Sequence, residues 1–549
     1  PAAVRTSAQS GGWSSGSTWV SGVAPVTRDD AIIATGHTVT NPGTITSLTI
    51  QTGATLDHNN EMLIYGNYTN NGTHSGAAGG NGIRLFSSAL TIITVDGTGS
   101  ITNTGTFTFY NQNSSTSIAS TANLTFAGRI TLSGNLTVNN NGIITGTSAL
   151  GIDGTSQGST WVNAANSTLN FAGPYGGPFG SSVNLTASAV PNTVNYNGAV
   201  VDQTVKAITY DTLMINNTAN NLVNNTIGAT LGGAVTVTNL YIGNVNPNSI
   251  LSAATFNITG NAGGAMTMGA GSILYLGYTS SAAGGAFPLN FTTANITLNP
   301  TSTVVYRANA SQTISPAPAS YGNLTLSTGA ATVVKTVGAA LTVNGNFTLD
   351  AAPVQFNAGT SLTHTIGGNW TNNSTHATPI TWTTANTITL AGITQQTLSG
   401  KMTGTSRFNN LTITNNSGID PDSSPSVIFT SNAEATGAVT ITTASVKVRF
   451  KSGGTYTFPN INFDGGAIAT RVQFRSSTPG TRWNLAAVGT QNVLNTDAKD
   501  SDANSGNTIQ ANTVNGNLDS GNNLNWFFGN SCTTTATGDW DAAGTWNAP

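Results

Sequence analysis

The sequence predicts an all-β protein that folds as an elongated β-solenoid, or β-helix, of stacked coils, with room for small β-sandwich-like modules at its ends. Three observations lead to this fold class: the scarcity of charge, the alternation of short apolar runs, and a long repeated motif. Charged residues make up only 6% of the 549 residues, so the charged helix formers are nearly absent. Thr alone contributes 92 residues and Gly 64, and with Asn and Ser they fill about half of the chain. This composition favours strands and tight turns over helices.

Short strand-like runs recur along the chain and alternate apolar and polar residues. Examples are residues 48–51, 101–109 and 235–242, and Asn-Gly, Asp-Gly or Gly-Asn turns separate such runs. Period-two alternation between turn signals predicts half-buried β-strands. A hydrophobic fraction of 38%, arranged in these runs, argues against a disordered chain.

A longer motif favours a solenoid over a sandwich or a barrel. A Gln-Thr-apolar unit is followed by an aromatic residue and a further strand pattern in three places: Gln203 before Tyr210, Gln312 before Tyr321, and Gln396 before Phe408. The aromatic residues lie 111 and 87 residues apart, so the repeat is elastic. In a solenoid each coil stacks on the next, and Thr and Asn can form ladders between coils. About 20 to 25 residues per coil would give on the order of 25 coils. Several sandwich domains in series are the alternative.

Charge, hydropathy and cysteine content exclude several classes of protein. The formal net charge of −3 offers no basic surface for nucleic acid. Because no run of 18 apolar residues occurs, we expect no membrane span. The single Cys532 excludes an internal disulfide, and we expect it to be a small buried residue. The chain begins with Pro1 and not with Met, so we expect a processed product or a fragment.

The most specific pattern lies in residues 447–528. It includes Arg475 to Leu485, Asp497 to Ala511, and Asp519-Ser-Gly-Asn-Asn-Leu-Asn-Trp526-Phe-Phe. This segment resembles the closing portion of large secreted bacterial β-helix surface proteins, which ends in a similar Asp-Ser-Gly-Asn-Asn signature. The three Gln-Thr copies and the opening segment look like the body and the start of the same proteins. The resemblance implies a cell-surface adhesin or a structural fibre.

The two ends of the chain carry the same tryptophan spacing. Trp13 and Trp19 near the start match Trp540 and Trp546 at the finish, each pair separated by five residues and each followed by Ala-Pro. Either further modules follow this one, or residues from about 531 onward dock on the next copy of the protein. Since large aromatic residues commonly anchor interfaces, all four are candidates for subunit docking. The alternative is that each Trp packs inside its own module.

These patterns divide the chain into four predicted parts. Residues 1–45 form an N-terminal start module with the Trp-x5-Trp motif, and residues 46–446 form the solenoid body with the three long repeats. Residues 447–530 form a closing β module. Residues 531–549 are a C-terminal extension that repeats the start module.

Catalytic chemistry has little support in the sequence. Enzymes on β-helices usually act on polysaccharides and need clustered carboxylates or bases, whereas carboxylates here are few and scattered. The histidines show no metal-ligand spacing. One loop, with Asp500, Asp502 and Asn504, alternates oxygen ligands as calcium sites do, but it departs from the usual calcium-loop pattern. An Asx-turn loop is the simpler interpretation, and calcium is the alternative.

The sequence therefore predicts an extracellular structural protein without catalytic activity, a subunit of a filament or surface fibre that forms a head-to-tail homopolymer through its terminal segments. We expect it to need no cofactor, with calcium at residues 500–504 as the less favoured alternative. Self-association is the expected partnership, with glycans or surfaces as further partners. The alternative functions are a glycan- or surface-binding adhesin and, with less support, a β-helix polysaccharide lyase or hydrolase.

Overall fold

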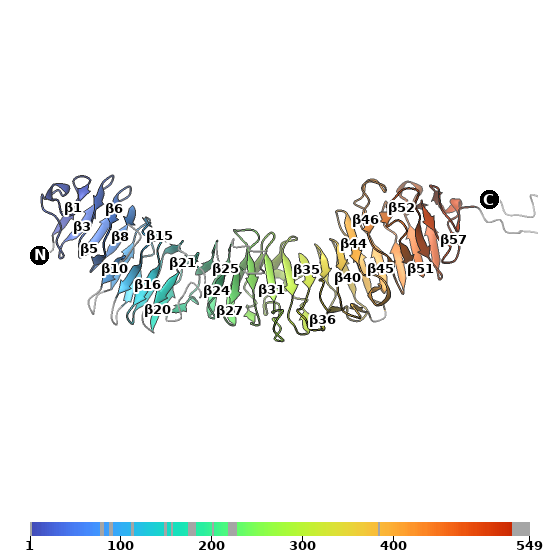
Figure 1. The fold of residues 1–549 in the computed structure, drawn as a ribbon, viewed down its shortest axis with the longest axis horizontal. Helices are drawn as coiled ribbons and strands as arrows, with labels where there is room; N and C mark the ends of the chain where they lie inside the picture. The colour runs from blue at the N-terminus through green and yellow to red at the C-terminus, as the bar shows by residue number, and fades with distance from the viewer. Residues whose placement is uncertain are drawn as a thin grey trace, which may run out of the picture. The chain divides into compact units, whose positions relative to one another are not determined.

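The computed structural model is nearly all β, with 46% of residues in strands and 3% in helices, and its parallel coils stack into a β-solenoid of about 21 turns (Figure 1). The predicted fold class is confirmed. The structure describes residues 3–76, 82–86, 92–110, 115–147, 151–154, 158–173, 183–199, 202–217, 228–382 and 385–529. The coils are fewer than the roughly 25 expected because many are longer than assumed. Ala31 pairs with Leu48, 17 residues on, whereas Gln396 pairs with Val427, 31 residues on.

The chain divides into two compact units. Unit 1 comprises residues 1–275 and 287–297, and unit 2 comprises residues 276–286 and 298–549. Each unit is a stack of coils with its own buried core.

In unit 1, a typical coil contributes one strand to each of three parallel sheets. Strands β7 (Met62–Ile64), β8 (Tyr68–Asn70) and β9 (Thr73–Gly76) form one such coil. Their neighbours in the next coil are β10 (Ile83–Phe86), β11 (Ile93–Asp96) and β12 (Ser100–Ile101). Sheet 1 runs from β1 (Val4–Thr6) to β22 (Val183–Thr186), sheet 2 from β2 (Gly11–Gly12) to β32 (Ile296–Leu298), and sheet 3 from β7 to β19 (Ile152–Gly154).

Unit 2 repeats this arrangement with different strands. Sheet 4 has 14 strands, of which those from β33 (Thr303–Tyr306) to β58 (Leu518–Asp519) lie in unit 2. Sheet 5 runs from β34 (Gln312–Ile314) to β42 (Ile380–Thr381), and sheet 6 from β37 (Thr342–Val343) to β54 (Gln491–Leu494). Sheet 7 runs from β47 (Ala433–Glu434) to β56 (Ser501–Asp502). The last described strands, β57 (Ile509–Gln510) and β59 (Trp526–Phe527), pair with each other. Short 3-10 turns such as η3 (Gly404–Ser406) occupy corners between strands.

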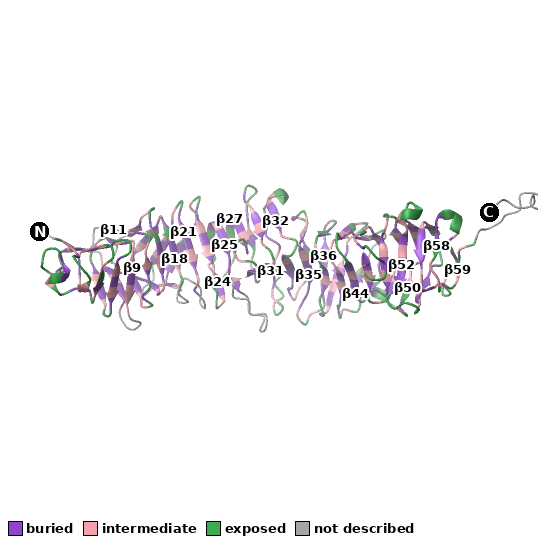
Figure 2. Cartoon of the chain, turned by 90° about the horizontal axis from the view of Figure 1, so that it is seen from above, coloured by how far each residue is buried: buried purple, intermediate pink, exposed green. Residues whose placement is uncertain are grey.

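Alternation along each strand separates core from surface. In β40 (Thr363–Ile366), β43 (Thr387–Leu390) and β45 (Asn410–Ile413), the register places like residues beside each other in successive coils. The inward column is Ile366, Leu390 and Ile413, all buried, and the outward column is Thr365, Thr389 and Thr412. Because side chains of a strand point alternately to its two faces, one register builds both columns. Figure 2 shows this alternation of buried and intermediate residues along the strands, with most exposed residues in the connecting loops.

The Gln of the repeated motif is a buried corner residue. Gln203 of β24 (Gln203–Val205), Gln312 of β34 and Gln396 of β44 (Gln396–Gly400) are all buried. Each amide oxygen accepts a hydrogen bond from a backbone N–H four or five residues earlier, in Gly198 at 2.8 Å, Ala308 at 3.1 Å and Gly392 at 2.8 Å. Each amide nitrogen donates to a carbonyl of an earlier coil, in Phe171 at 3.0 Å, Leu276 at 3.1 Å and Ile366 at 2.9 Å. The side chain thus replaces a missing backbone partner at the bend.

The aromatic residue of the motif completes the same corner. In the first two copies it is a buried tyrosine paired with a second one: Tyr196 with Tyr210 at 2.9 Å, and Tyr306 with Tyr321 at 3.1 Å, between hydroxyl oxygens. In the third copy Phe408 takes the tyrosine position and is fully buried. Phe408 has no hydroxyl, and its ring packs 5.4 Å from that of Trp370. A second tyrosine is therefore not required beside Phe408, because this corner contains no buried hydroxyl that needs a hydrogen bond.

A buried imidazole pair lies inside unit 1. His58 of β6 (Thr55–His58) and His74 of β9 have ring centroids 4.9 Å apart, and Tyr68 Oη lies 2.9 Å from His74 Nδ1. Burial lowers the pKa of His58 and holds the pKa of His74 well below its usual range. Asp57 opposes this shift at His58, while the neighbouring His58 adds to it at His74. Both imidazoles are therefore neutral in the folded chain near pH 7.

Replacing the buried corner amide should destabilise unit 2. Gln396→Leu leaves the Gly392 N–H without its acceptor and removes one of the two donors to the Ile366 carbonyl. We expect a loss of about 1 to 3 kcal/mol in the free energy of unfolding. Chemical denaturation measures it. Gln395→Leu is the matched control, because the Gln395 side chain is exposed and makes one hydrogen bond, to the Pro425 carbonyl. Equal losses in the two variants would contradict the corner role.

Acidification should weaken the coils around His58 and His74. Both folded pKa values lie below the ordinary value of 6.5, so the unfolded chain takes up protons first as the pH falls through 6.5. The free energy of unfolding is unaffected above pH 6.5. It decreases as the pH falls from 6.5 to the pKa values that the two histidines have in the folded chain. Hydrogen exchange of residues 55–76 at about pH 7.5 and about pH 5 measures the effect. The double variant His58→Leu/His74→Leu should lose this pH dependence, whereas His376→Gln, in unit 2, should keep it.

Candidate functional site

The two N-terminal tryptophans lie inside their own module. Trp13 follows β2 and Trp19 follows η1 (Gly16–Thr18), and their side chains are only 4% and 2% exposed. Their ring centroids are 5.1 Å apart in an edge-to-face arrangement. The Trp19 Nε1–H donates a hydrogen bond to the Trp13 carbonyl at 2.8 Å. The spacing of five residues therefore closes a tight loop around an edge-to-face indole pair.

This loop also covers the outer edge of the first strand. Ser7 and Trp19 form an antiparallel bridge, and the Val20 N–H donates to the Thr6 carbonyl at 2.9 Å. The chain thus caps β1 with its own hairpin on the side away from β3 (Asp30–Ile33). Such a cap protects a strand edge that would otherwise pair with other chains.

The structure bears differently on the two tryptophan pairs that were predicted to dock subunits. Trp13 and Trp19 have almost no free surface to bury against a second copy, so they could act only through the shape of the cap that they fill. Trp540 and Trp546 lie outside the described residues, as do Cys532 and the whole predicted extension 531–549. Docking through these residues stays a prediction.

Exposed apolar side chains gather on the first coils of unit 1 and the last coils of unit 2. The structure describes 18 large apolar side chains as exposed, and eight of them lie within residues 4–26 or 514–527. At the first end they are Val4, Val20, Val23 and Val26, and at the last end Val514, Leu518, Leu524 and Phe527. β58 and β59 are the final strands of their sheets in the part of the chain that the structure describes. The first and the last described coils thus each carry four exposed large apolar side chains.

The predicted calcium loop is held by hydrogen bonds within the protein. Asp500 is buried with a positive φ of 54°, and its carboxylate accepts from the Gly480 N–H at 3.1 Å and from Asn522 Nδ2 at 2.7 Å. Asp502 Oδ1 accepts from the Asn504 N–H at 2.9 Å, which is an Asx turn. Among the described residues, no group of three or more His, Cys, Asp or Glu side chains could hold a metal ion. Calcium at Asp500, Asp502 and Asn504 therefore stays a prediction from the sequence.

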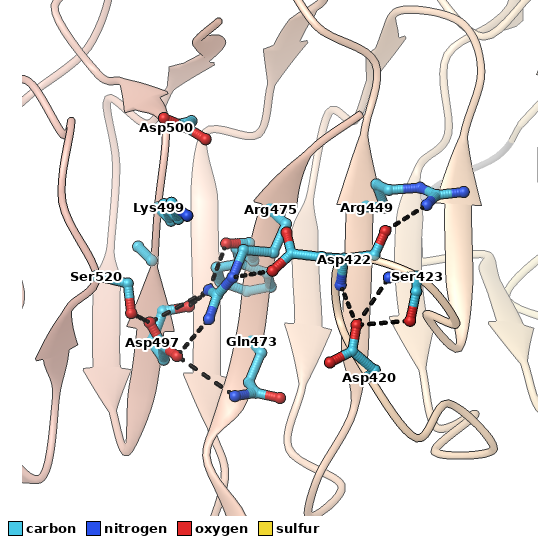
Figure 3. A network of polar contacts seen from close by, with 12 residues as sticks. Asp420, Asp422, Ser423, Arg449, Gln473, Arg475, Asp497, Lys499, Asp500 and Ser520 are labelled. Atoms are coloured by element: carbon cyan, nitrogen blue, oxygen red, sulfur yellow. Dashed lines mark hydrogen bonds and ion pairs between the residues drawn. The ribbon is translucent and has the colours of Figure 1, made fainter. Parts of the chain in front are cut away.

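The main cluster of charges in unit 2 surrounds a buried arginine (Figure 3). Arg475 of β52 (Val472–Ser476) forms an ion pair with Asp497 of β55 (Thr496–Ala498), in which Nη2 and Oδ2 are 2.7 Å apart. The two side chains are only 8% and 4% exposed. Asp497 also accepts from Ser520 Oγ at 2.6 Å and from Gln473 Nε2 at 3.3 Å. The network connects three successive coils of sheet 4.

A neighbouring loop lies against this ion pair. Asp422 Oδ2 is 3.8 Å from Arg475 Nε, and the Asp422 carbonyl accepts from Arg449 Nη1 at 2.8 Å. Asp420 accepts hydrogen bonds from the backbone and hydroxyl of Ser423, which lower the pKa of its carboxyl. Residues 420–422 thus form a turn, and the ion contact fixes this turn on the sheet. The sequence alone does not reveal the pairing of Arg475 with Asp497, because 22 residues separate them.

This cluster has the geometry of a structural ion pair. A catalytic cation must face a substrate, whereas the Arg475 guanidinium is buried and shared between two carboxylates and a backbone carbonyl. Its charge is compensated within the protein, which is the condition for burying a charge.

Comparison with known proteins gives no further guide to the site. The sequence matches no protein-family model, and no curated protein or solved structure is significantly similar to it. Within the described ranges, no helix is long and apolar enough to cross a membrane.

Removing one member of the buried ion pair should be costly. Arg475→Met leaves the Asp497 carboxylate buried without its partner, and we expect about 3 to 5 kcal/mol of destabilisation in a denaturant titration. The double variant Arg475→Met/Asp497→Leu should recover most of this loss. Arg449→Met, which removes a half-exposed neighbour, serves as the control and should cost much less. A double variant as unstable as the single one would show that the pair is not the cause.

Proposed function

We propose that the chain is an extracellular structural protein, a subunit of a filament or surface fibre in which copies join head to tail. The apolar surface at both ends of the described chain carries this proposal. A contact between the first coils of one copy and the last coils of the next is heterologous and does not close, so it generates a filament.

The chemistry of the ends supports this contact. Val20 is 70% exposed and Val23 is 51% exposed on the N-terminal cap, and Leu524 and Phe527 are 37% and 38% exposed on the last coil. These side chains lose contact with water when the two ends meet, at about 25 cal/mol per Å² of apolar surface. Because charge is scarce in this chain, little electrostatic repulsion opposes the contact.

The C-terminal extension 531–549 supplies the second element of the proposal. It repeats the Trp-x5-Trp spacing that forms the cap around Trp13 and Trp19. Trp540 and Trp546 are therefore proposed to anchor the extension on the next copy. The buried N-terminal pair contributes the shape of the cap and not free indole surface.

The rest of the chain fits a role without catalysis. The charged cluster around Arg475 is internally compensated, and we propose that the protein is not an enzyme and needs no cofactor. The resemblance of residues 447–528 to the closing portion of bacterial β-helix surface proteins supports an extracellular, cell-surface location.

Electron microscopy of the purified chain tests the assembly. We expect unbranched fibres from the full chain, and few or none from Val20→Lys or Leu524→Lys, since a buried unpaired charge costs about 2 kcal/mol or more at each contact. Ile393→Lys is the matched control, because Ile393 is 93% exposed and lies away from both ends.

Deleting residues 531–549 tests the terminal segment separately. The shortened chain should keep its circular dichroism spectrum and its thermal midpoint but should no longer form fibres. Fibres that persist after the deletion would refute the docking role of the extension. A full chain that stays monomeric in light scattering at all concentrations would refute the head-to-tail assembly.

A further inference from the structure

A groove on the surface of unit 2 has the composition of a ligand site. Its volume is about 410 Å³, within the range of about 300 to 1,000 Å³ that is typical of small-ligand pockets. The groove combines one indole ring, one guanidinium, one amide and several hydroxyls. Its lining residues are Thr378, Ile380, Thr381, Trp382, Gly404, Thr405, Arg407, Asn409 and Thr436.

Hydrogen bonds between neighbouring coils hold the walls of the groove together. Thr405 Oγ1, in η3, donates to the Ala377 carbonyl at 3.0 Å. Asn409 Nδ2 donates to Thr436 Oγ1 at 3.0 Å, in the coil that follows. Phe408 and Ala435 form a parallel bridge below. The groove is therefore built on paired strands and corners, which position its side chains before a ligand arrives.

Trp382 is the aromatic wall of this groove. Among the tryptophans that the structure describes, only Trp382 and Trp526 are not buried. Its Nε1–H donates to the Arg407 carbonyl, and its ring lies 6.4 Å from that of the buried Phe408. The hydrogen bond fixes the ring beside the open space. The half-exposed indole offers a flat apolar surface to a ligand. Because its orientation is already fixed, the side chain loses little conformational entropy on binding.

Arg407 supplies the only charged side chain in the lining. It is exposed, and its guanidinium makes no hydrogen bond or ion pair with the residues that the structure describes. The nearby Glu434 is occupied, since its Oε2 accepts from the Gly404 N–H at 2.8 Å. Most cations in this unit are paired or donate to carbonyls, as Arg475 and Lys401 do. The Arg407 guanidinium beside the Trp382 indole can therefore donate two hydrogen bonds to the carboxylate of a ligand.

We propose that this groove binds an acidic saccharide, a sugar ring bearing a carboxylate. The C–H face of the ring packs on Trp382, the carboxylate receives two hydrogen bonds from Arg407, and ring hydroxyls contact Asn409 and the threonine hydroxyls. This activity goes beyond the proposed structural role, because it lets each subunit attach to a polysaccharide along the side of the coil stack. It does not depend on assembly.

Calorimetric titration of the full chain with an oligosaccharide of galacturonic acid tests the proposal. Its methyl ester is the matched ligand, since esterification removes the charge and keeps the sugar ring. We expect the acid to bind at least about tenfold more tightly than the ester, with an affinity that falls at high salt. Trp382→Ala should weaken binding of the acid by about tenfold or more.

Three further variants separate the two contacts from general damage. Arg407→Gln should reduce the affinity for the acid to that for the ester, and Arg407→Lys should recover part of it because one donor point remains. Trp526→Ala, at the other half-buried tryptophan, should bind as the unmodified chain does. Equal binding of acid and ester would overturn the role of Arg407. No binding of the acid by the folded full chain, or unchanged binding by Trp382→Ala, would overturn the site.

Discussion

Parallel backbone pairing between successive coils is the constraint on which the rest of this structure depends. Every strand ladder that the structure describes is parallel, so each residue sits beside its counterpart one coil away, as Thr389 does beside Thr412. This geometry repeats any side chain down a column. Charges of one sign would repel along such a column, whereas Thr and Asn can pair with copies of themselves. A composition with 6% charged residues is a direct consequence.

The same constraint explains why the core contains many amides. Coils must bend at corners, and there the backbone loses its regular partners. Gln203, Gln312 and Gln396 fill these positions, and Asn140 and Asn163 stack inside unit 1 with Nδ2 and Oδ1 2.8 Å apart. Lys335 is an extreme case, because it is fully buried and donates to two carbonyls and to Gln312 Oε1 at 2.7 Å. Burial lowers the pKa of Lys335 to about 7. Uncharged polar groups satisfy such positions at lower cost than ions do.

The ends and the sides of a coil stack offer different kinds of surface. On the first and last coils that the structure describes, apolar residues such as Val20 and Phe527 are exposed. Along the sides of the described coils, corners and inserted loops interrupt the regular columns. The groove beside Trp382 and the turn at Asp420 both lie at such breaks. The proposed assembly and the proposed ligand binding therefore use different parts of one architecture.

The sequence by itself determined the fold class, the strands as a class and the repeated corner motif, because alternation, turn residues and the Gln-Thr pattern are local properties of the chain. It did not determine which residues meet. Coil lengths vary from 17 residues at Ala31 to 31 at Gln396, so only the folded register brings Arg475 to Asp497, or Trp382 to Arg407. The sequence also singled out Trp13 and Trp19 without showing that they are buried in a cap, because the cap forms only when their loop pairs with the end of β1. Tertiary structure decided the contacts of Arg475 and of Trp382, since their partners lie a whole coil away along the chain.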